Sequence, residues 1–181
     1  MMSLLFRPAV FKVLMLFSLE PGKKFTRKEI KEHTKLNNVP LDSALRLLEA
    51  SGVISRERRM YKLDFERGEM IVELVRKEHA KFNRIPLRAY FAVVDIAERL
   101  AKEKCDVYLF GSYAKGSFTA ESDLDIAVIS AKDVDLGFVK RFEKKYQIKI
   151  EVHSFGTEFY RHRSDKFVRE VLEGIRIIKN L

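Results

Sequence analysis

Apolar residues recur with helical spacing through the first part of the chain. The segment PAVFKVLMLFSL, residues 8–19, is apolar enough for a buried helix, and Pro8 stands where a helix can begin. In TRKEIKEH, Thr26 precedes Glu29 by three residues, which is a capping-box pattern at the start of a short helix. The pattern therefore predicts two helices at the start of the chain.

A third helix and two short strands are predicted next. In LDSALRLLEASG the apolar residues keep helical spacing over residues 40–51, and Gly52 stands where a C-terminal cap belongs. The stretch VISRERRMYKLDF then predicts two strands, Val53–Ile54 and Met60–Phe65, around a charged turn. That turn contains Arg56, Arg58 and Arg59.

Three helices followed by a basic hairpin resemble the winged helix-turn-helix family, over about the first third of the chain. The resemblance implies that the third helix enters the major groove of DNA and that the hairpin touches backbone phosphate. It implies that DNA contacts the exposed side of the third helix, which carries Asp42, Ser43 and Arg46. It also implies that DNA contacts the wing residues Arg56, Arg58 and Arg59. Many modules of this kind bind proteins or dimerise instead, so both interpretations stay open.

Helical periodicity continues on both sides of Pro86. Residues 67–85 are predicted to form a helical connector, and the segment after Pro86 the first helix of a second domain. The expected organisation is thus a winged helix domain at 1–66, a connector at 67–85 and a second domain at 86–181.

The second domain begins with strand patterns interrupted by a glycine-containing turn. DVYLF reads as a strand, and GSYAKG as a turn in which Gly111 and Gly116 let the backbone approach a ligand closely. A Walker-type phosphate loop is excluded, because Ser117-Phe118 replaces the lysine and hydroxyl pair that should follow. In SDLDIAVIS, strand alternation places Asp123 and Asp125 on one face.

A third acid is predicted on the face of a later strand. In YQIKIEVHSF, alternation turns Glu151 to the polar face together with Lys149 and His153. Neighbouring carboxylates repel unless a cation lies between them, and Mg²⁺ suits such oxygen ligands. The alternatives are solvated acids at a strand end for Asp123 and Asp125, and an exposed residue of an edge strand for Glu151.

These residues resemble the minimal nucleotidyltransferases of the DNA polymerase beta-like superfamily. The resemblance covers roughly residues 86–155: a strand, Gly111-Ser112, ten residues, Asp123-Leu124-Asp125, and a later strand with an acid. It implies that Gly111 and Ser112 contact the nucleoside triphosphate, with Lys115 as the basic residue of the turn. It also implies that Asp123, Asp125 and Glu151 form a two-metal magnesium site, with Glu151 helping to activate the incoming hydroxyl.

The resemblance implies a magnesium-dependent enzyme that transfers a nucleoside monophosphate, with AMP from ATP favoured, to a hydroxyl acceptor. Minimal nucleotidyltransferases often act as antitoxins that modify a tyrosine of a helical HEPN-type toxin, so a toxin protein is one expected partner. Other relatives modify RNA or small molecules. The alternative is a DNA-binding transcriptional regulator whose second domain only senses nucleotide.

The C-terminal segment is predicted to be helical. DLGFVKRFEKKY is an amphipathic helix between two strands, and SDKFVREVLEGIRIIKNL is expected to form a helix over the sheet with a break near Gly174. An exposed part of this apolar tail would allow a homodimer. Together the patterns predict a mixed α+β protein, with a winged helix before a small mixed sheet and its flanking helices.

Composition and charge narrow the class of partner. Hydrophobic residues make up 46% of the chain and charged residues 34%, which is typical of a folded domain. Of the net charge of +9, most lies in the N-terminal part: residues 1–66 carry thirteen Lys/Arg against eight Asp/Glu. This favours a phosphate-bearing partner there, although a solvated basic surface is as common.

No membrane or disulfide chemistry is expected. Arg7, Pro8 and Lys12 interrupt the first apolar run, and no segment reaches the roughly 18 apolar residues of a membrane span. The single cysteine, Cys105, has no disulfide partner within the chain and is expected to be a small buried residue. We therefore expect a cytoplasmic protein.

Overall fold

The computed structural model of the chain describes residues 7–82 and 85–181. It divides into two compact units, of which the first ends at Lys81 and the second begins at Phe82. The segment predicted as a connector, 67–85, contributes most of a helix that packs within the first unit, and its residues 83 and 84 lie outside the described residues.

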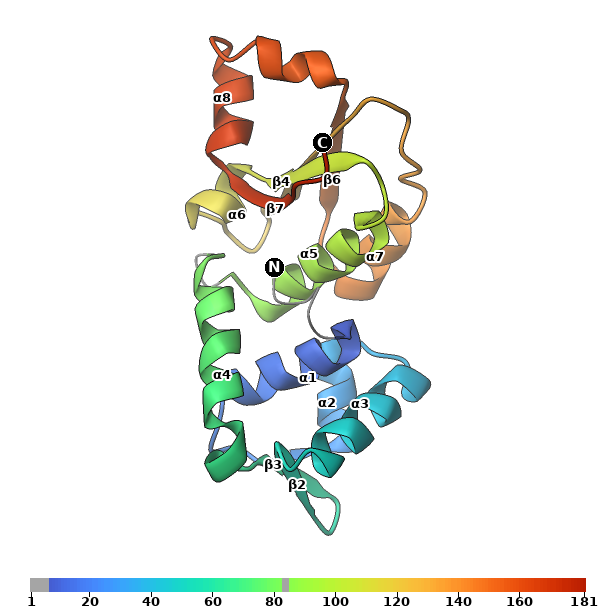
Figure 1. The fold of residues 1–181 in the computed structure, drawn as a ribbon, viewed down its shortest axis with the longest axis vertical. Coiled ribbons are helices and arrows are strands. Elements are labelled where there is room, and N and C mark those ends of the chain that lie inside the picture. The colour runs from blue at the N-terminus through green and yellow to red at the C-terminus, as the bar shows by residue number, and fades with distance from the viewer. Residues whose placement is uncertain (1–6, 83–84) are drawn as a thin grey trace. The chain divides into compact units, whose positions relative to one another are not determined.

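The N-terminal unit combines helices with a small antiparallel sheet (Figure 1). Its strands pair in the order β1-β3-β2. The elements are α1 (Pro8–Leu19), β1 (Phe25–Thr26), α2 (Arg27–Thr34), α3 (Asn38–Ala50), β2 (Ile54–Glu57), β3 (Met60–Leu63) and α4 (Phe65–Ala80).

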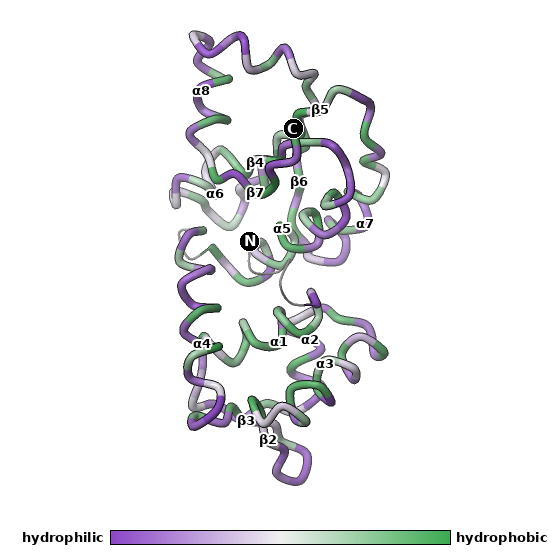
Figure 2. Tube along the Cα trace, viewed as in Figure 1, coloured by the Kyte–Doolittle hydropathy of each residue, from purple (hydrophilic) through white to green (hydrophobic). Residues whose placement is uncertain are grey.

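The predicted N-terminal helices are confirmed. Helix α1 begins at Pro8, and its apolar side chains form the core against α2, α3 and α4. The capping box at the start of α2 is complete: the Thr26 side chain accepts a bond from the Glu29 backbone N–H, and the Glu29 carboxylate accepts from the Thr26 backbone. Figure 2 shows that α1 is mostly hydrophobic, whereas the turn between β2 and β3 is hydrophilic.

The hairpin differs from its prediction at both ends. Strand β2 begins at Ile54 and runs to Glu57, so that Arg56 lies in the strand and the turn is made by Arg58 and Arg59. Strand β3 stops at Leu63, because Asp64 caps the next helix by accepting bonds from the backbone of the first helical turn. The sequence pattern missed this cap and extended the strand.

The C-terminal unit is built on a four-stranded mixed sheet with the order β6-β5-β4-β7. Strand β4 runs antiparallel to both β5 and β7, whereas β5 and β6 are parallel. The elements are α5 (Leu87–Leu100), β4 (Cys105–Leu109), α6 (Gly111–Lys115), β5 (Leu124–Ser130), α7 (Val139–Tyr146), β6 (Ile150–Phe155), the 3-10 helix η2 (Thr157–Arg161), α8 (Lys166–Glu173) and β7 (Ile175–Ile178).

Helices cover both faces of this sheet (Figure 1). Helices α5 and α7 lie on one face, where Lys145 and Tyr146 of α7 donate hydrogen bonds to Asp95 of α5. On the other face, α8 and η2 pack over a cluster that includes Tyr108, Phe110 and residues of β5. The chain is therefore mixed α+β, as predicted, and Cys105 is buried in β4.

The prediction for the C-terminal tail was wrong beyond Gly174. Helix α8 ends at Glu173, and Ile175–Ile178 form β7 at the free edge of β4. A Cβ at Gly174 would lie 2.4 Å from the Leu109 carbonyl oxygen, so glycine permits a close approach to β4. The β-branched residues that follow favour a strand where a partner strand is available.

Helix length also bears on the membrane question. Within the described ranges 7–82 and 85–181, no helix is both long and apolar enough to cross a membrane.

Candidate active site

The parallel pairing of β5 and β6 brings two predicted acids together. In this register Asp125 lies opposite Glu151, and Ala127 lies opposite His153. Residues opposite each other in a ladder share a face of the sheet, so both carboxylates project to the side covered by α8 and η2. Alternation within one strand could not establish this, because it requires the register between strands.

Gly111 packs directly against Asp125. Its φ of 66° lies in the left-handed region, and a Cβ at this position would be 2.1 Å from the Asp125 Oδ2 atom. No side chain fits that space, so the glycine of the Gly-Ser pair is required by both backbone and packing. The predicted turn is the five-residue helix α6, and the carbonyl of Asp125 accepts a bond from Phe110 N–H at 3.1 Å.

A histidine joins the two acids. One ligand atom each of Asp125, Glu151 and His153 lies within 4.8 Å of the others. His153 Nε2 is 3.5 Å from Glu151 Oε1. The strand alternation had placed His153 on the face of Glu151 but gave no reason to assign it a role.

Asp123 lies apart from this group of three. It immediately precedes β5, and its carboxylate accepts a charge-assisted hydrogen bond from Lys149, the residue before β6. The backbone N–H of Leu124 also bonds to the Lys149 carbonyl at 2.8 Å, which ties the starts of both strands together. Asp123 thus has a cationic partner, whereas Asp125 is flanked by acids.

The electrostatic setting of Asp125 is unusual for a carboxylate. Burial raises its pKa above the ordinary value, and the negative charges of Glu151 and Asp123 raise it further, while His153 acts in the opposite direction. A partly buried carboxylate held beside other acids is typical of sites that receive a cation or a proton.

The other predicted nucleotide-binding residues surround Gly111. Ser112 is partly exposed, and its carbonyl accepts a bond from the backbone of Ser117 at the end of the turn. Lys115 is exposed and forms an ion pair with Glu170 of α8 at 2.5 Å. Tyr113 is buried and stacks on Phe118, so it fixes the turn from inside.

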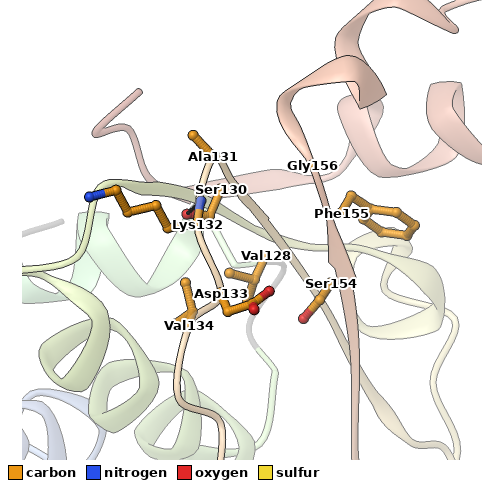
Figure 3. Close-up of a pocket in the computed structure, with 9 residues that line it drawn as sticks. All are labelled: Val128, Ser130, Ala131, Lys132, Asp133, Val134, Ser154, Phe155 and Gly156. Atoms are coloured by element: carbon orange, nitrogen blue, oxygen red, sulfur yellow. Dashed lines mark hydrogen bonds between the residues drawn. The ribbon is translucent and has the colours of Figure 1, made fainter.

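An open hollow of about 680 Å³ lies elsewhere on the same unit (Figure 3). Residues of the C-terminal ends of β5 and β6 and of the loop after β5 line it, including Ser130, Lys132, Asp133 and Ser154. Asp125 is the second residue of β5 and is not among the lining residues. The hollow therefore does not coincide with the acidic group.

Comparison with known proteins agrees with the geometry. A family model described as a nucleotidyltransferase domain matches residues 92–178. A putative protein adenylyltransferase of Methanocaldococcus jannaschii is 35% identical over 77 residues, which are 40% of this chain and 75% of that protein. The chain belongs to the nucleotidyltransferase family. No solved structure matches it significantly.

The match places the grouped residues inside this nucleotidyltransferase domain. Gly111, Asp125, Glu151 and His153 all lie within residues 92–178. The protein is a nucleotidyltransferase enzyme, and the acids of β5 and β6 are its candidate active site.

The residues predicted to bind DNA lie in the N-terminal unit of this nucleotidyltransferase. Ser43 and Arg46 are exposed on α3, and Arg58 and Arg59 are exposed at the hairpin turn. Arg56 lies over the Tyr61 ring at 5.5 Å from its centroid and donates a bond to the Arg58 carbonyl. Asp42, also on α3, is held by two hydrogen bonds from Arg27 of α2.

Proposed function

We propose that this nucleotidyltransferase moves AMP from ATP to a hydroxyl group of a protein acceptor, with magnesium. The observation that carries the proposal is the register that sets Asp125 beside Glu151, with Gly111 packed against Asp125. The similarity to a putative protein adenylyltransferase supports AMP as the group and a protein as the acceptor.

The roles of the residues follow from their placement. Asp123, Asp125 and Glu151 are the proposed ligands of magnesium, which would stabilise charge on the attacking and leaving oxygens. Gly111, Ser112 and Lys115 are the proposed contacts of the triphosphate. Glu151 helps to remove the proton of the acceptor hydroxyl, whose oxygen bonds to the α-phosphorus as pyrophosphate leaves.

The donor set fits a divalent cation. Asp125 and Glu151 supply carboxylate oxygens within 4.8 Å of each other. Burial and then the repulsion from neighbouring acids raise the pKa of Asp125, and a bound cation would relieve that repulsion. Two rearrangements are needed for the full set. Asp123 has to leave Lys149, and Lys115 has to exchange Glu170 for phosphate.

Label transfer tests the reaction. The protein is incubated with each nucleoside triphosphate, labelled at the α-phosphate, and magnesium, with and without an extract of host cells. We expect label from ATP on a protein band with the wild type and none with the Asp123→Ala/Asp125→Ala double variant. Nucleotide binding without any transfer would favour a sensor of nucleotide over an enzyme of this specificity.

A helical toxin protein of the HEPN type is the acceptor to test first, as the family resemblance suggests. Co-expression with such a partner, followed by intact-mass measurement, should show the mass of one added AMP, and fragmentation of its peptides should locate that AMP on a tyrosine. If the toxin stays unmodified while proteins of the extract become labelled, the acceptor is another protein.

We further propose that the N-terminal unit binds DNA as a winged helix-turn-helix. Helix α3 with exposed Ser43 and Arg46, and the hairpin with exposed Arg58 and Arg59, support this role. The basic excess of residues 1–66 has the sign that phosphate binding needs.

Charge reversal in the wing tests DNA binding. Arg56→Glu with Arg58→Glu should weaken duplex binding in a gel shift, more strongly at low salt, while nucleotide transfer is kept. Lys132→Glu with Lys144→Glu, at two exposed lysines of the C-terminal unit, is a matched control of equal charge change. An affinity equal to that of the wild type would remove the wing from the DNA interface.

A further inference from the structure

We propose that His153 is a third ligand of the cation at Asp125 and Glu151, and that its imidazole shifts the site toward Mn²⁺ relative to Mg²⁺. The inference rests on the metal site of the proposed function and adds to it a ligand and a selectivity. It concerns binding of the metal alone, so it can be tested without knowledge of the acceptor.

The first argument is distance. The ligand atoms of the three residues lie within 4.8 Å of one another, with His153 Nε2 3.5 Å from Glu151 Oε1. Ligands about 2.1 Å from one ion lie roughly 3 to 4.2 Å apart in an octahedral shell. A small movement of side chains would therefore bring all three onto one cation.

The second argument is how the imidazole is held. Three phenylalanine rings from separate elements pack around it. Phe110, which follows β4, and Phe167 of α8 meet it edge-on at centroid distances of 5.5 and 5.6 Å, and Phe155 of β6 lies parallel at 6.4 Å. These rings restrict the orientation of His153 and offer its nitrogens no hydrogen-bond acceptor, whereas the Nε2 edge lies by Glu151.

The third argument is ligand chemistry. Mg²⁺ prefers oxygen ligands and keeps much of its water, whereas imidazole nitrogen suits the first-row transition metals. Mn²⁺ accepts both carboxylate and imidazole. A site of two carboxylates and one imidazole should therefore gain affinity for Mn²⁺ from the histidine, with little gain for Mg²⁺.

Equilibrium metal binding tests the selectivity. Mn²⁺ affinity is measured from the electron paramagnetic resonance signal of the free ion, and Mg²⁺ affinity from competition with it. We expect His153→Ala to weaken Mn²⁺ binding about tenfold and Mg²⁺ binding less than about twofold. His162→Ala, an exposed histidine after η2, is the matched control and should change neither affinity.

The metal-bound wild type gives a second readout that does not depend on the folding of a variant. Electron spin echo modulation of bound Mn²⁺ should show coupling to a ¹⁴N nucleus if an imidazole is a ligand. Absence of that coupling, or an equal loss of Mn²⁺ and Mg²⁺ affinity in His153→Ala, would overturn the inference and leave His153 as a partner that only positions Glu151.

The Asp125→Asn variant tests separately whether the proposed metal site binds a cation at all. If this variant binds Mn²⁺ as well as the wild type does, the acids of β5 and β6 hold no cation and the proposed metal site itself fails. If it loses Mn²⁺ while His153→Ala binds normally, only the role of His153 is wrong.

Discussion

Two paired acids of the N-terminal unit and Asp125 of the C-terminal unit lie in opposite electrostatic settings. In the N-terminal unit, hydrogen bonds from Arg27 lower the pKa of Asp42, and those from Lys24 and Lys62 lower the pKa of Glu57 to about 2. In the C-terminal unit, burial and two neighbouring acids raise the pKa of Asp125. Within residues 7–82 and 85–181, no lysine or arginine forms an ion pair with Asp125.

Asp42 and Glu57 join structural elements, whereas we propose that Asp125 binds a cation. Asp42 connects α2 to α3, and Glu57 joins the hairpin to Lys24, so each carboxylate is satisfied by the protein itself. Asp125 is placed where burial and neighbouring acids disfavour its charge, an arrangement that is common where a carboxylate receives a cation or a proton. Each of the following substitutions alters one of the two units and leaves the other unchanged.

Asp125→Asn should have the largest effect. It keeps the size of the side chain and removes the charge that a cation needs, so nucleotide transfer should fall by about 10³-fold or more. Because the fold disfavours that charge, the melting temperature without metal should stay equal or rise. Asp133→Asn, an exposed acid of the same unit, should leave transfer unchanged.

Gly111→Ala should be next. The added methyl would meet the Asp125 carboxylate, and the φ of 66° disfavours alanine, so either the turn or Asp125 has to move. We expect a loss of transfer of about 10²-fold, as for misplaced catalytic groups, and a destabilisation of about 1–3 kcal/mol. Normal activity would show that Gly111 does not fix the position of Asp125.

Gly174→Ala should affect stability alone. Its Cβ would lie 2.4 Å from the Leu109 carbonyl oxygen, which obstructs the path from α8 into β7. Overpacking of this kind lowers the free energy of unfolding by about 1–3 kcal/mol, measured by denaturant titration. Gly22→Ala, where no atom lies within 4 Å of the new Cβ, is the control and should change stability little.

Glu57→Gln should have the smallest effect. The folded pKa of Glu57, about 2, lies below the ordinary value of 4.5, so its pairing stabilises the fold above pH 4.5 and is lost as the pH falls toward 2. The variant should therefore lose less melting temperature than the wild type between these pH values. Identical acid titrations would mean that the exposed Lys24–Glu57–Lys62 group adds nothing measurable to stability.

Local patterns in the sequence predicted much of the fold. The helix at Pro8, the capping box at Thr26 and the break at Gly174 depend on residues close in sequence, and each is present. The strand after Gly174 and the end of β3 at Leu63 were missed. The first depends on the free edge of β4, which is distant in sequence, and the second on a cap by Asp64 that competed with a strand pattern.

The candidate site shows the same limit. Alternation predicted that Glu151 shares a polar face with His153, yet only the register of β5 with β6 sets Glu151 beside Asp125. The ion pair between Asp123 and Lys149 and the packing of Gly111 on Asp125 likewise join residues from different elements. Such contacts follow from the fold, which the spacing of a motif does not describe.

The most direct test of the central claim is to compare ATP labelled at the α-phosphate with ATP labelled at the γ-phosphate, using wild-type protein, Asp125→Asn and the host extract. We predict that, above the labelling by the extract alone, the wild type adds only the α-label to a protein acceptor and Asp125→Asn adds neither label. Transfer of the γ-label, or equal transfer of the α-label by Asp125→Asn, would contradict AMP transfer at the acids of β5 and β6.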